Sequence, residues 1–371
     1  MLKVITVVGT RPEIIRLACV IPLLDKYTKH ILVHTGQNYD YELNQIFFED
    51  LELRKPDYFL NVDTSSLGHV LGETLINIEE ILDIEKPNAM LILGDTNASI
   101  AAIMAKRKHI PIYHMEAGNR SFDANVPEEI NRKMIDHISD FNLVYTENSR
   151  RHLLVEGLSH RRVYVTGSPM YEVLNKYLPK IQSSDILNKL EINAKKYFLI
   201  SVHREENVDY PDNLRRIGNV LNTLADKFGL PIIVSTHPRT RKRIEMLEGF
   251  EFNPLIQFLK PFGFLDYNYL QMNSLCVISD SGTISEESAI LKFPAITIRN
   301  SMERPEAIDA GTIILSGFDP EIVLDSIRLA VDEGANYKEI CPEYEVQNTA
   351  MRVLKLVMGT ARLHKLWSGL Y

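Results

Sequence analysis

The sequence predicts an α/β protein of two Rossmann-like domains, each with a parallel sheet and helices on both faces. Short runs rich in Val, Ile and Leu alternate with segments of helical pattern, the order expected when parallel strands share one sheet. The alternation stops between Gly167 and Lys196 and then resumes. A chain of 371 residues is also too long for one ordinary domain core.

The first half opens with a continuous β-branched run at residues 3–8, typical of a strand buried on both faces. Gly9, Thr10 and Arg11 then form a turn, and Pro12 suits the first turn of a helix. The strands predicted in this half are residues 3–8, 30–35, 89–93, 110–113, 143–145 and 163–166. The predicted helices are residues 12–27, 68–85 and 98–107, with two more that begin at Pro127 and Glu147.

The segment between the halves is polar and helical, and Ser168-Pro169 and Pro179 interrupt it, so we place the domain junction there. The strands predicted after it are residues 197–202, 231–236, 256–259, 275–279, 295–298 and 312–315. The helices predicted there are residues 213–228, 239–247, 265–272 and 283–291, followed by two helices up to the C-terminus.

Composition narrows the class of protein. Apolar residues make up 45% and charged residues 24%, the mix of a soluble globular protein. A net charge of -8 argues against a nucleic-acid partner bound through its phosphates. The three cysteines are far apart, so neither a zinc site nor a disulfide framework is expected. Without a bilayer-spanning run or the basic start of a signal peptide, the sequence indicates a cytoplasmic protein with no membrane partner.

Polar residues follow many of the predicted strands in both halves. They occupy residues 9–11, 94–96 and 114–120 in the first half, and residues 203–207, 237–239, 280–283 and 303–306 in the second. One polar loop after a strand means little, but several at the same edge of a sheet indicate an active site. We expect that site in the cleft between the two domains.

The stretch at residues 114–132, HMEAGNRSFDANVPEEINR, follows a predicted buried strand and is the centre of this expected site. Pro127 opens a helix in which Glu128 and Arg132 are four residues apart and share a face. A solvated helix start, with acidic residues favoured by the helix dipole, is the alternative. It explains Glu128 but not Glu116 or Arg120, which come directly after the buried strand.

Three carboxylates arrive from adjacent elements of the first half: Asp95, Glu116 and Glu128. Clustered carboxylates raise one another's pKa, so one can hold a proton while another accepts one. A cation site is the alternative, since hard cations prefer oxygen ligands. Basic residues lie beside each carboxylate in the sequence, so we predict acid/base chemistry and no metal.

In the second half, Ser281, Gly282 and Thr283 open a helix after a buried strand, a favourable position for a phosphate. A simple N-cap is the alternative. One turn further on, Glu287 could accept the hydroxyls of a ribose. The residues that could supply positive charge to a diphosphate are Arg11, His203 and Arg304. No GxGxxG and no GxxxxGK[ST] is present, so no dinucleotide cofactor and no P-loop are expected.

Taken together, these motifs resemble a known family. GTRPE, GDT, H-x-EAG-x-R, PEE-x-NR, HR-x-E, DSG-x-x-x-EE and ERPEA occur in this order from Thr10 to Gly311. The set resembles the non-hydrolysing UDP-N-acetylglucosamine 2-epimerases. The resemblance implies the glycosyltransferase-B architecture, a UDP-sugar substrate, no cofactor and a homodimer. It also implies a first domain of residues 1–168, joined by a C-terminal helix at about 355–371, and a second domain of residues 169–354.

The resemblance also implies roles for single residues. Asp95, Glu116, Glu128 and His203 match catalytic residues of the family. The positions that match substrate or UDP binding are Arg11, Arg16, Arg132, Ser281, Gly282, Thr283, Glu287 and Arg304. In this family, anti elimination of UDP gives a 2-acetamidoglucal, and UDP then adds back with the other configuration at C2. Removing and returning a C2 proton needs carboxylates on both sides of C2, and the departing diphosphate needs fixed positive charge.

Several positions depart from the common pattern of the family. Arg16 stands in place of a lysine, EAGNRS replaces EAGLRT, and DSGT replaces DSGG. Residues 37–41, QNYDY, replace the QHREM segment associated with a second, activating UDP-sugar. These changes resemble the branch that makes UDP-N-acetyl-L-fucosamine for capsule or O-antigen from the 2-acetamido-2,6-dideoxy-L-talose derivative. The alternatives are epimerisation of UDP-N-acetylglucosamine to UDP-N-acetylmannosamine and, more distantly, a glycosyltransferase or a nucleotide-sugar sensor.

Overall fold

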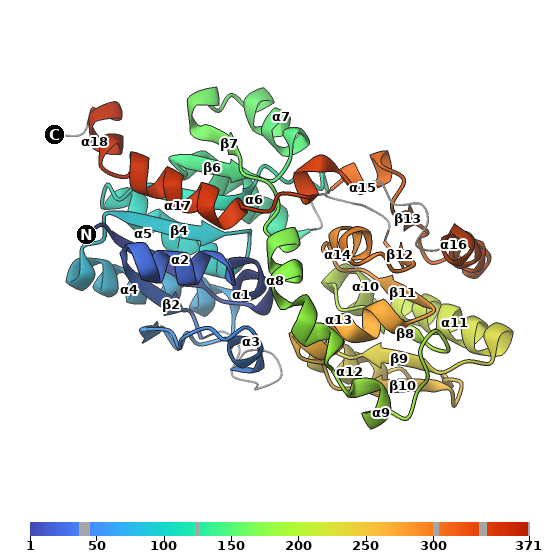
Figure 1. The fold of residues 1–371 in the computed structure, drawn as a ribbon. Helices are drawn as coiled ribbons and strands as arrows, with labels where there is room; N and C mark the ends of the chain where they lie inside the picture. The colour runs from blue at the N-terminus through green and yellow to red at the C-terminus, as the bar shows by residue number, and fades with distance from the viewer. Residues whose placement is uncertain (37–44, 124–125, 300–303, 334–339, 370–371) are drawn as a thin grey trace. The chain divides into compact units, whose positions relative to one another are not determined.

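The computed structural model describes residues 1–36, 45–123, 126–299, 304–333 and 340–369. Residues 37–41 and Glu303, both singled out by the sequence, lie outside these ranges. The chain divides into two compact units, one of Met1–Val173 with Pro342–Tyr371 and one of Leu174–Cys341 (Figure 1). Each unit is an α/β structure with a parallel sheet, so the predicted fold class of two Rossmann-like domains is confirmed.

The sheet of the first unit has the strand order β3-β2-β1-β4-β5-β6-β7, and its pairs are parallel. Its strands are β1 Lys3–Val8, β2 Lys29–His34, β3 Tyr58–Phe59, β4 Ala89–Leu93, β5 Ile112–Ala117, β6 Phe141–Val144 and β7 Val163–Val165. After β1 the chain adds β2 and then β3 on one side of β1, and β4 then pairs with the other side of β1. The carboxyl ends of β1 and β4 are therefore a topological switch point, where open α/β sheets bind ligands.

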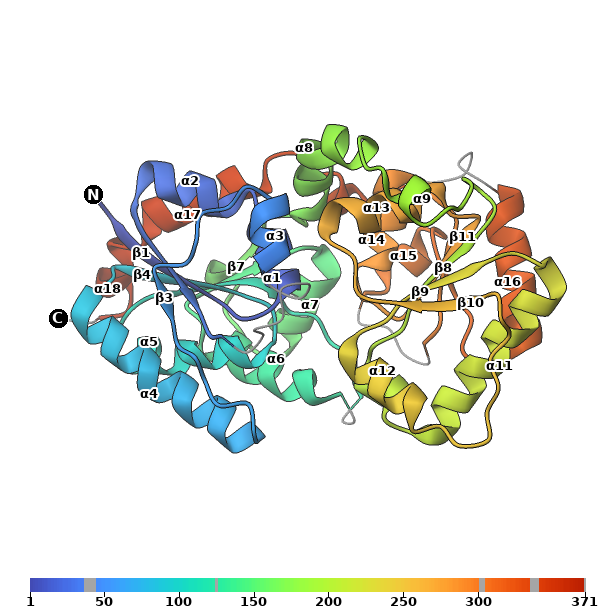
Figure 2. The ribbon, with the colours of Figure 1, turned by 90° about the horizontal axis from the view of Figure 1, so that it is seen from below.

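Helices cover both faces of this sheet (Figure 2). The helices of the first unit are α1 Arg11–Leu17, α2 Val20–Tyr27, α3 Gln45–Asp50, α4 Leu67–Glu85, α5 Ala102–Arg107, α6 Pro127–Ile138, α7 Glu147–Val155, α17 Thr349–Thr360 and α18 Leu363–Trp367, with 3₁₀ turns η2 Asn97–Ala101, η3 His160–Arg162 and η5 Pro342–Tyr344. Ile5 and Val7 of β1 share an apolar core with Ile78 of α4 and Ile135 of α6. Burying that face of the sheet supplies most of the stability of such a layer.

The second unit repeats the architecture with the strand order β10-β9-β8-β11-β12-β13. Its strands are β8 Phe198–Ser201, β9 Ile232–Ser235, β10 Ile256–Leu259, β11 Cys276–Ser279, β12 Ala295–Thr297 and β13 Ile314–Leu315. Its helices are α9 Ile186–Lys189, α10 Glu205–Val208, α11 Pro211–Phe228, α12 Pro238–Glu245, α13 Phe264–Asn273, α14 Ile284–Leu291, α15 Glu306–Asp309 and α16 Pro320–Glu333, while α8 Met170–Gln182 begins in the first unit. The switch point of this sheet lies between β8 and β11.

Three predicted elements differ from the structure. The helix predicted at residues 12–27 is two helices, α1 and α2. Pro22 lacks an N–H to donate to the carbonyl of Ala18, and its ring crowds that carbonyl, so a continuous helix cannot form. The strand predicted at residues 110–113 is β5, which runs on through His114 and Glu116 to Ala117. Three helices rather than two, α16, α17 and α18, lie towards the C-terminus in the part of the chain that the structure describes.

No helix within the described ranges combines the length and the apolar character needed to cross a membrane.

Candidate functional site

The site in the first unit is built at the carboxyl ends of β1, β4 and β5. Glu116 lies at a β-bulge, because the pairing of β5 with β6 shifts between Met115 and Ala117. Its φ angle is 65°, in the left-handed region that costs a residue with a Cβ about 1–2 kcal/mol. Strained residues of this kind gather at functional sites. The bulge and the φ angle therefore make Glu116 a candidate site residue.

The carboxylate of Glu116 is paired with a guanidinium. Arg16 on α1 places Nη1 2.5 Å from Oε2 of Glu116, and both side chains are largely buried. The amide of Asn119 lies on the other side, with Nδ2 3.5 Å from Oε1. A Cβ on Gly94, at the end of β4, would lie 3.7 Å from Oε2 of Glu116, so this carboxylate also adjoins the loop that carries Asp95.

Asp95 forms the second carboxylate–guanidinium pair. Nε of Arg132 lies 2.5 Å from Oδ2 of Asp95, and Nη1 of Arg132 lies 3.1 Å from Glu129. Asn131, from the same helix, donates to the carbonyl of Asp95 at 2.9 Å. The second turn of α6 is thus tied to the loop that follows β4.

The sequence predicted an acid/base set of carboxylates with basic residues beside them. In the structure, Glu116 and Asp95 each contact an arginine, Arg16 and Arg132 respectively. Glu128 lies half-buried in the first turn of α6, and Arg11 is the first residue of α1, also half-buried. Among the described residues, no group of three His, Cys, Asp or Glu side chains is arranged to hold a metal ion.

Arg120, singled out by the sequence, contributes to the core rather than to the site surface. Its guanidinium contacts both carboxylate oxygens of Glu156 at 2.7 Å and Asp136 at 2.7 Å. Its side chain is fully buried. A buried arginine with two carboxylate partners is a structural ion network, and this network explains the position of Arg120 directly after the buried strand.

Glu13 was missed as a site residue. It is buried in the first turn of α1, and Oε2 accepts hydrogen bonds from the backbone N–H groups of Gly9 and Thr10 at 2.9 and 2.7 Å. Oε1 accepts from the hydroxyl of Thr96 at 3.0 Å, so Glu13 joins the loops that carry Arg11 and Asp95. Burial raises the pKa of Glu13 to about 7, against the opposing effect of these donors. The T-x-x-E capping-box pattern was the available signal.

The raised pKa of Glu13 predicts a pH-dependent stability. Its neutral form is favoured in the folded state, so stability is full below pH 4.5 and falls as pH rises through about 7. The loss should reach about 3 kcal/mol. Glu13→Gln can keep the bonds that its carbonyl oxygen accepts from the N–H groups of Gly9 and Thr10 and from the hydroxyl of Thr10, and can donate to Thr96, so we expect it to remove this dependence. Urea unfolding at pH 5 and pH 8 measures the change in the free energy of unfolding, with a substitution of the exposed Glu80, Glu80→Gln, as the control. The same change in free energy with pH in the wild type and in Glu13→Gln would contradict the prediction.

The second unit places a histidine against a buried carboxylate at its switch point. Asp280, directly after β11, accepts hydrogen bonds from the backbone N–H groups of His203 and Arg204 at 3.0 and 2.9 Å and from Asn207 at 2.9 Å. Nδ1 of His203 lies 3.2 Å from Oδ1 of Asp280. Burial opposes ionisation of Asp280, but the His203 charge and these donors outweigh it and lower its pKa to about 2. Asp280 therefore fixes both the backbone and the ring of His203.

The predicted phosphate-binding turn lies next to this pair. Thr283 is the N-cap of α14, and Oγ of Ser281 accepts from its N–H at 3.3 Å. A Cβ on Gly282 would lie 3.6 Å from the guanidinium of Arg204. The turn thus combines two hydroxyls and a nearby guanidinium. The alternative of a simple N-cap explains the Ser281 contact but not the position of Arg204.

Glu287 and Arg304 each have a protein partner. Oε2 of Glu287 accepts from Nε2 of Gln271 at 2.7 Å, which fixes the orientation of its carboxylate. Arg304 is buried and forms an ion pair with the fully buried Glu286.

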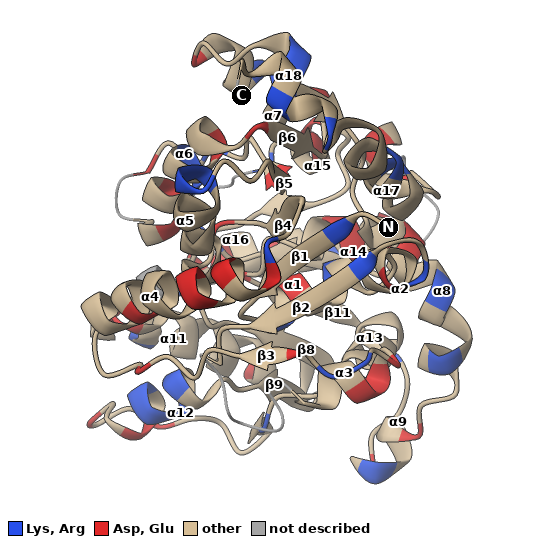
Figure 3. Cartoon of the chain, turned by 90° about the vertical axis from the view of Figure 1, so that its left-hand side faces the viewer, with Lys and Arg blue, Asp and Glu red and all other residues tan. Residues whose placement is uncertain are grey.

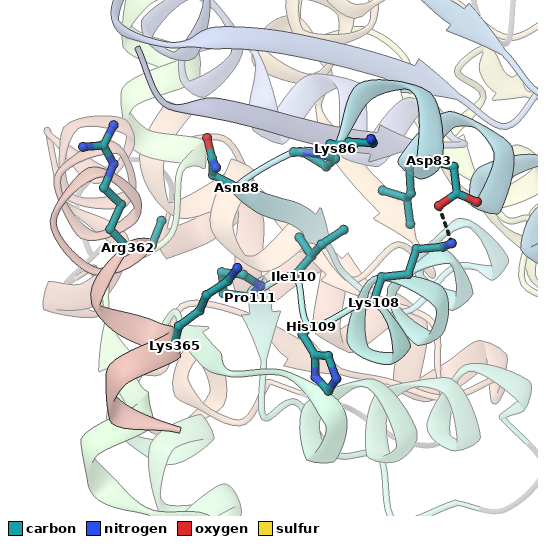
Figure 4. A pocket seen from close by; sticks show the side chains of 12 residues that line it. Asp83, Lys86, Asn88, Lys108, His109, Ile110, Pro111, Arg362 and Lys365 are labelled. Carbon is teal, nitrogen blue, oxygen red and sulfur yellow. Dashed lines mark hydrogen bonds and ion pairs between the residues drawn. The ribbon is translucent and has the colours of Figure 1, made fainter. Parts of the chain in front are cut away.

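A cavity of about 580 Å³ lies at the opposite edge of the first sheet, beside the starts of β4 and β5 (Figure 4). Lys86, Lys108 and Arg362 line it and follow the ends of α4, α5 and α17. Lys108 contacts Asp83, which also lines the cavity, at 2.6 Å, and α4 carries a row of acidic residues (Figure 3). Cations at helix carboxyl ends are favoured by the helix dipole. These charges therefore have a structural explanation, and the strand carboxyl ends remain the candidate site.

Comparison with known proteins gives a consistent result. The model of a family described as UDP-N-acetylglucosamine 2-epimerase matches residues 24–358. A UDP-N-acetylglucosamine 2-epimerase of Methanococcus maripaludis is 38% identical over 336 residues, covering 88% of this chain and 91% of that protein. A UDP-2,3-diacetamido-2,3-dideoxy-D-glucuronate 2-epimerase of Pseudomonas aeruginosa is 33% identical and covers 91% and 96%.

Solved structures agree with these sequence relatives. A UDP-N-acetylglucosamine 2-epimerase of Rickettsia bellii has a TM-score of 0.91 and 50% identity, covering 98% of each chain. The Methanocaldococcus jannaschii enzyme, solved with UDP-N-acetylglucosamine and UDP, has a TM-score of 0.90 and 34% identity, covering 96% of this chain and all of that chain. The family expected from the sequence motifs is confirmed: this chain belongs to the UDP-N-acetylglucosamine 2-epimerase family.

Proposed function

We propose that this protein is a non-hydrolysing epimerase that inverts C2 of a UDP-activated 2-acetamido sugar by eliminating UDP and adding it back. The observation that carries the proposal is the arrangement at the first switch point. Glu116 at its bulge and Asp95 after β4 each contact a guanidinium, so two carboxylates with neighbouring positive charge are presented at the same edge of the sheet. Family membership supports the same reaction class.

In the elimination, a carboxylate takes the C2 proton and the C–H electron pair forms the C1=C2 double bond. The bond between C1 and the diphosphate oxygen breaks, and UDP leaves with its electrons. In the return step, the diphosphate oxygen attacks C1, and a second acid delivers a proton to the opposite face of C2. We assign these proton transfers to Asp95, Glu116 and Glu128, since they need groups on both sides of C2.

We assign UDP binding mainly to the second unit. The turn of Ser281, Gly282 and Thr283 offers backbone and hydroxyl donors, and Arg204 adds a positive charge beside it. We propose that His203, held by Asp280, and Arg304 stabilise the departing diphosphate, because fixed donors at developing charge are the largest catalytic contribution in many enzymes. Glu287 would accept the ribose hydroxyls. Arg11, Arg16 and Arg132 complete the binding set from the first unit.

For the sugar, we favour the 2-acetamido-2,6-dideoxy-L-talose derivative, giving UDP-N-acetyl-L-fucosamine. Asn119 supports this choice: Oδ1 accepts from Ser149 at 3.1 Å, so its amide is oriented with Nδ2 towards Glu116. A fixed amide can select a hydroxyl configuration. Phe122 is 74% exposed and could cover a 6-methyl group. UDP-N-acetylglucosamine is the alternative substrate, and several relatives are named UDP-N-acetylglucosamine 2-epimerase.

Offering both sugars to the purified protein should give a higher kcat/KM for the 6-deoxy-L-talo substrate, because an oriented polar group discriminates by hydroxyl configuration. Asn119→Leu should reduce that preference. Preference of the wild type for UDP-N-acetylglucosamine would overturn the substrate choice and leave the epimerase proposal intact.

Incubation in D₂O separates the distant alternatives: a transferase or a sensor returns the sugar without deuterium at C2. We also propose a homodimer, which light scattering tests.

A further inference from the structure

The bulge that presents Glu116 is held by one buried carboxylate. Asp136 on α6 is fully buried, and the groups around it come from residues on both sides of Glu116. Nδ1 of His114 lies 3.0 Å from Oδ1, the backbone N–H of Gly118 donates to Oδ2 at 3.2 Å, and Nη1 of Arg120 donates to Oδ2 at 2.7 Å. A single side chain thus fixes the strand before the bulge and the turn after it.

The same network reaches the loop that carries Asp95. Nε2 of His114 lies 2.8 Å from the carbonyl of Gly94, the residue before Asp95. Burial disfavours the charged form of His114, but the nearby Asp136 carboxylate and the carbonyl of Gly94 outweigh it and raise the pKa of His114. Movement of Asp136 would therefore disturb both carboxylates at once.

The chain after the bulge has little freedom of its own. Gly118 has a φ angle of 81°, and a Cβ at this position would lie 2.4 Å from the carbonyl oxygen of Ser149 on α7. Its own carbonyl is 2.9 Å from Nδ1 of His152. Glycine is required here both for its φ angle and for this close approach. The bulge is clamped between α6 and α7, and Asp136 is the charged part of the clamp.

We propose that Asp136 is a positioning residue for the C2 chemistry, whose buried carboxylate holds the bulge that presents Glu116. The inference rests on the proposed function, because its catalytic consequence requires that Glu116 transfers a proton. Asp136 contributes no proton itself and acts only through the geometry of Glu116 and of the Gly94–Asp95 loop.

The test compares Asp136→Asn with a matched control, Asp140→Asn. Asp140 is also a largely buried carboxylate of the first unit, and it accepts from the N–H of Ile112 at 3.0 Å and pairs with Lys106 at 2.6 Å. It therefore anchors β5 at the end opposite the bulge. We expect Asp136→Asn to lower kcat about 10- to 100-fold with KM and UDP affinity within about twofold, while Asp140→Asn keeps kcat within about twofold. Equal loss of kcat in the two variants would overturn the proposal.

Two further readouts make the result independent of overall stability. In a Glu116→Gln background, where the carboxylate that the bulge presents is absent, adding Asp136→Asn should lower residual C2 exchange by a smaller factor than it lowers kcat in the wild type, because only the Gly94–Asp95 loop remains to be positioned. Losses that multiply would contradict the proposal. If Asp136→Asn does not fold, Arg120→Lys keeps the charge but loses the guanidinium fork, and it should reproduce the kcat loss at about 3- to 10-fold; unchanged kcat in this variant would equally contradict it.

Amide hydrogen exchange separates this inference from the proposed function. The Gly118 N–H is bonded to Asp136, so exchange at residues 115–121 should be about tenfold faster in Asp136→Asn and unchanged in Asp140→Asn. If the wild type shows no C2 exchange with either sugar, the proposed function fails while this readout still reports on the clamp. Unchanged exchange at residues 115–121 in Asp136→Asn would refute the clamp whatever the enzyme does.

Discussion

Replacing Glu116 by glutamine should lower kcat for C2 epimerisation by roughly two to four decades, because an amide cannot take or return the C2 proton. Glutamine keeps the shape of the side chain and an oxygen that can accept from Arg16, which lies 2.5 Å from the carboxylate. Folding should therefore survive, with a loss of about 1–3 kcal/mol because Arg16 keeps only a neutral partner. Steady-state kinetics and thermal unfolding measure the two effects separately.

The matched control is Glu80→Gln on the exposed face of α4, which should retain wild-type kcat and stability. The corresponding amide changes at Asp95 and Glu128 should also remove most of kcat, since the proposal assigns all three carboxylates to proton transfer. A Glu116→Gln protein with kcat within tenfold of wild type would mean that the carboxylate at the bulge is structural. The strained backbone at Glu116 would then need another explanation.

Replacing Asp280 by asparagine should weaken both stability and turnover. Burial opposes the ionised form of Asp280, but His203 and the surrounding donors hold its pKa near 2, below the ordinary 3.8. A lowered carboxylate pKa stabilises the fold above pH 3.8, and that stability is lost as pH falls towards 2. Asp280→Asn should therefore cost about 2 kcal/mol at pH 7, and its unfolding free energy should approach that of the wild type below pH 4.

Turnover should fall about 100-fold in Asp280→Asn, because His203 loses the carboxylate that fixes its ring. His203→Gln provides the comparison, since it removes the imidazole and leaves Asp280 its backbone donors and Asn207. It should lower kcat by a similar factor with a smaller effect on acid stability. A stability difference between Asp280→Asn and wild type that is the same at pH 2.5 and pH 7 would contradict the ionic account of this pair.

The sequence predicts the alternation of strands and helices because buried parallel strands are unbroken apolar runs, as in β1 and β4. It also predicts that polar residues gather at strand ends. The course of β5 escapes prediction because His114 and Glu116 are polar, and the buried Asp136 and the carbonyl of Gly94 make His114 acceptable inside a strand. The break between α1 and α2 was readable from Pro22.

The candidate site, like the fold, contains residues that the sequence predicts and residues that it does not. Asp95, Glu116 and Arg132 are found from motifs, and the structure brings them together with the partners described above. Asp136 carries no local signal, because its partners at Gly118 and Arg120 are 18 and 16 residues away in the chain. The ion network around Arg120 includes Glu156, which is 36 residues from Arg120 in the chain. Contacts of this kind follow from tertiary packing and not from periodicity or local propensity.

The central claim is that a carboxylate removes the C2 proton while the bond between the sugar and UDP breaks. It is tested most directly by one incubation in D₂O of a UDP-sugar substrate labelled with ¹⁸O in the oxygen between C1 and the β-phosphorus. The account predicts deuterium at C2 of the product, together with migration of ¹⁸O into the non-bridging positions of the β-phosphate, both slowed by roughly two to four decades in Glu116→Gln. Inversion at C2 with deuterium but with the ¹⁸O retained in the bridge would contradict elimination. Recovery of unlabelled, uninverted sugar would contradict the epimerase function itself.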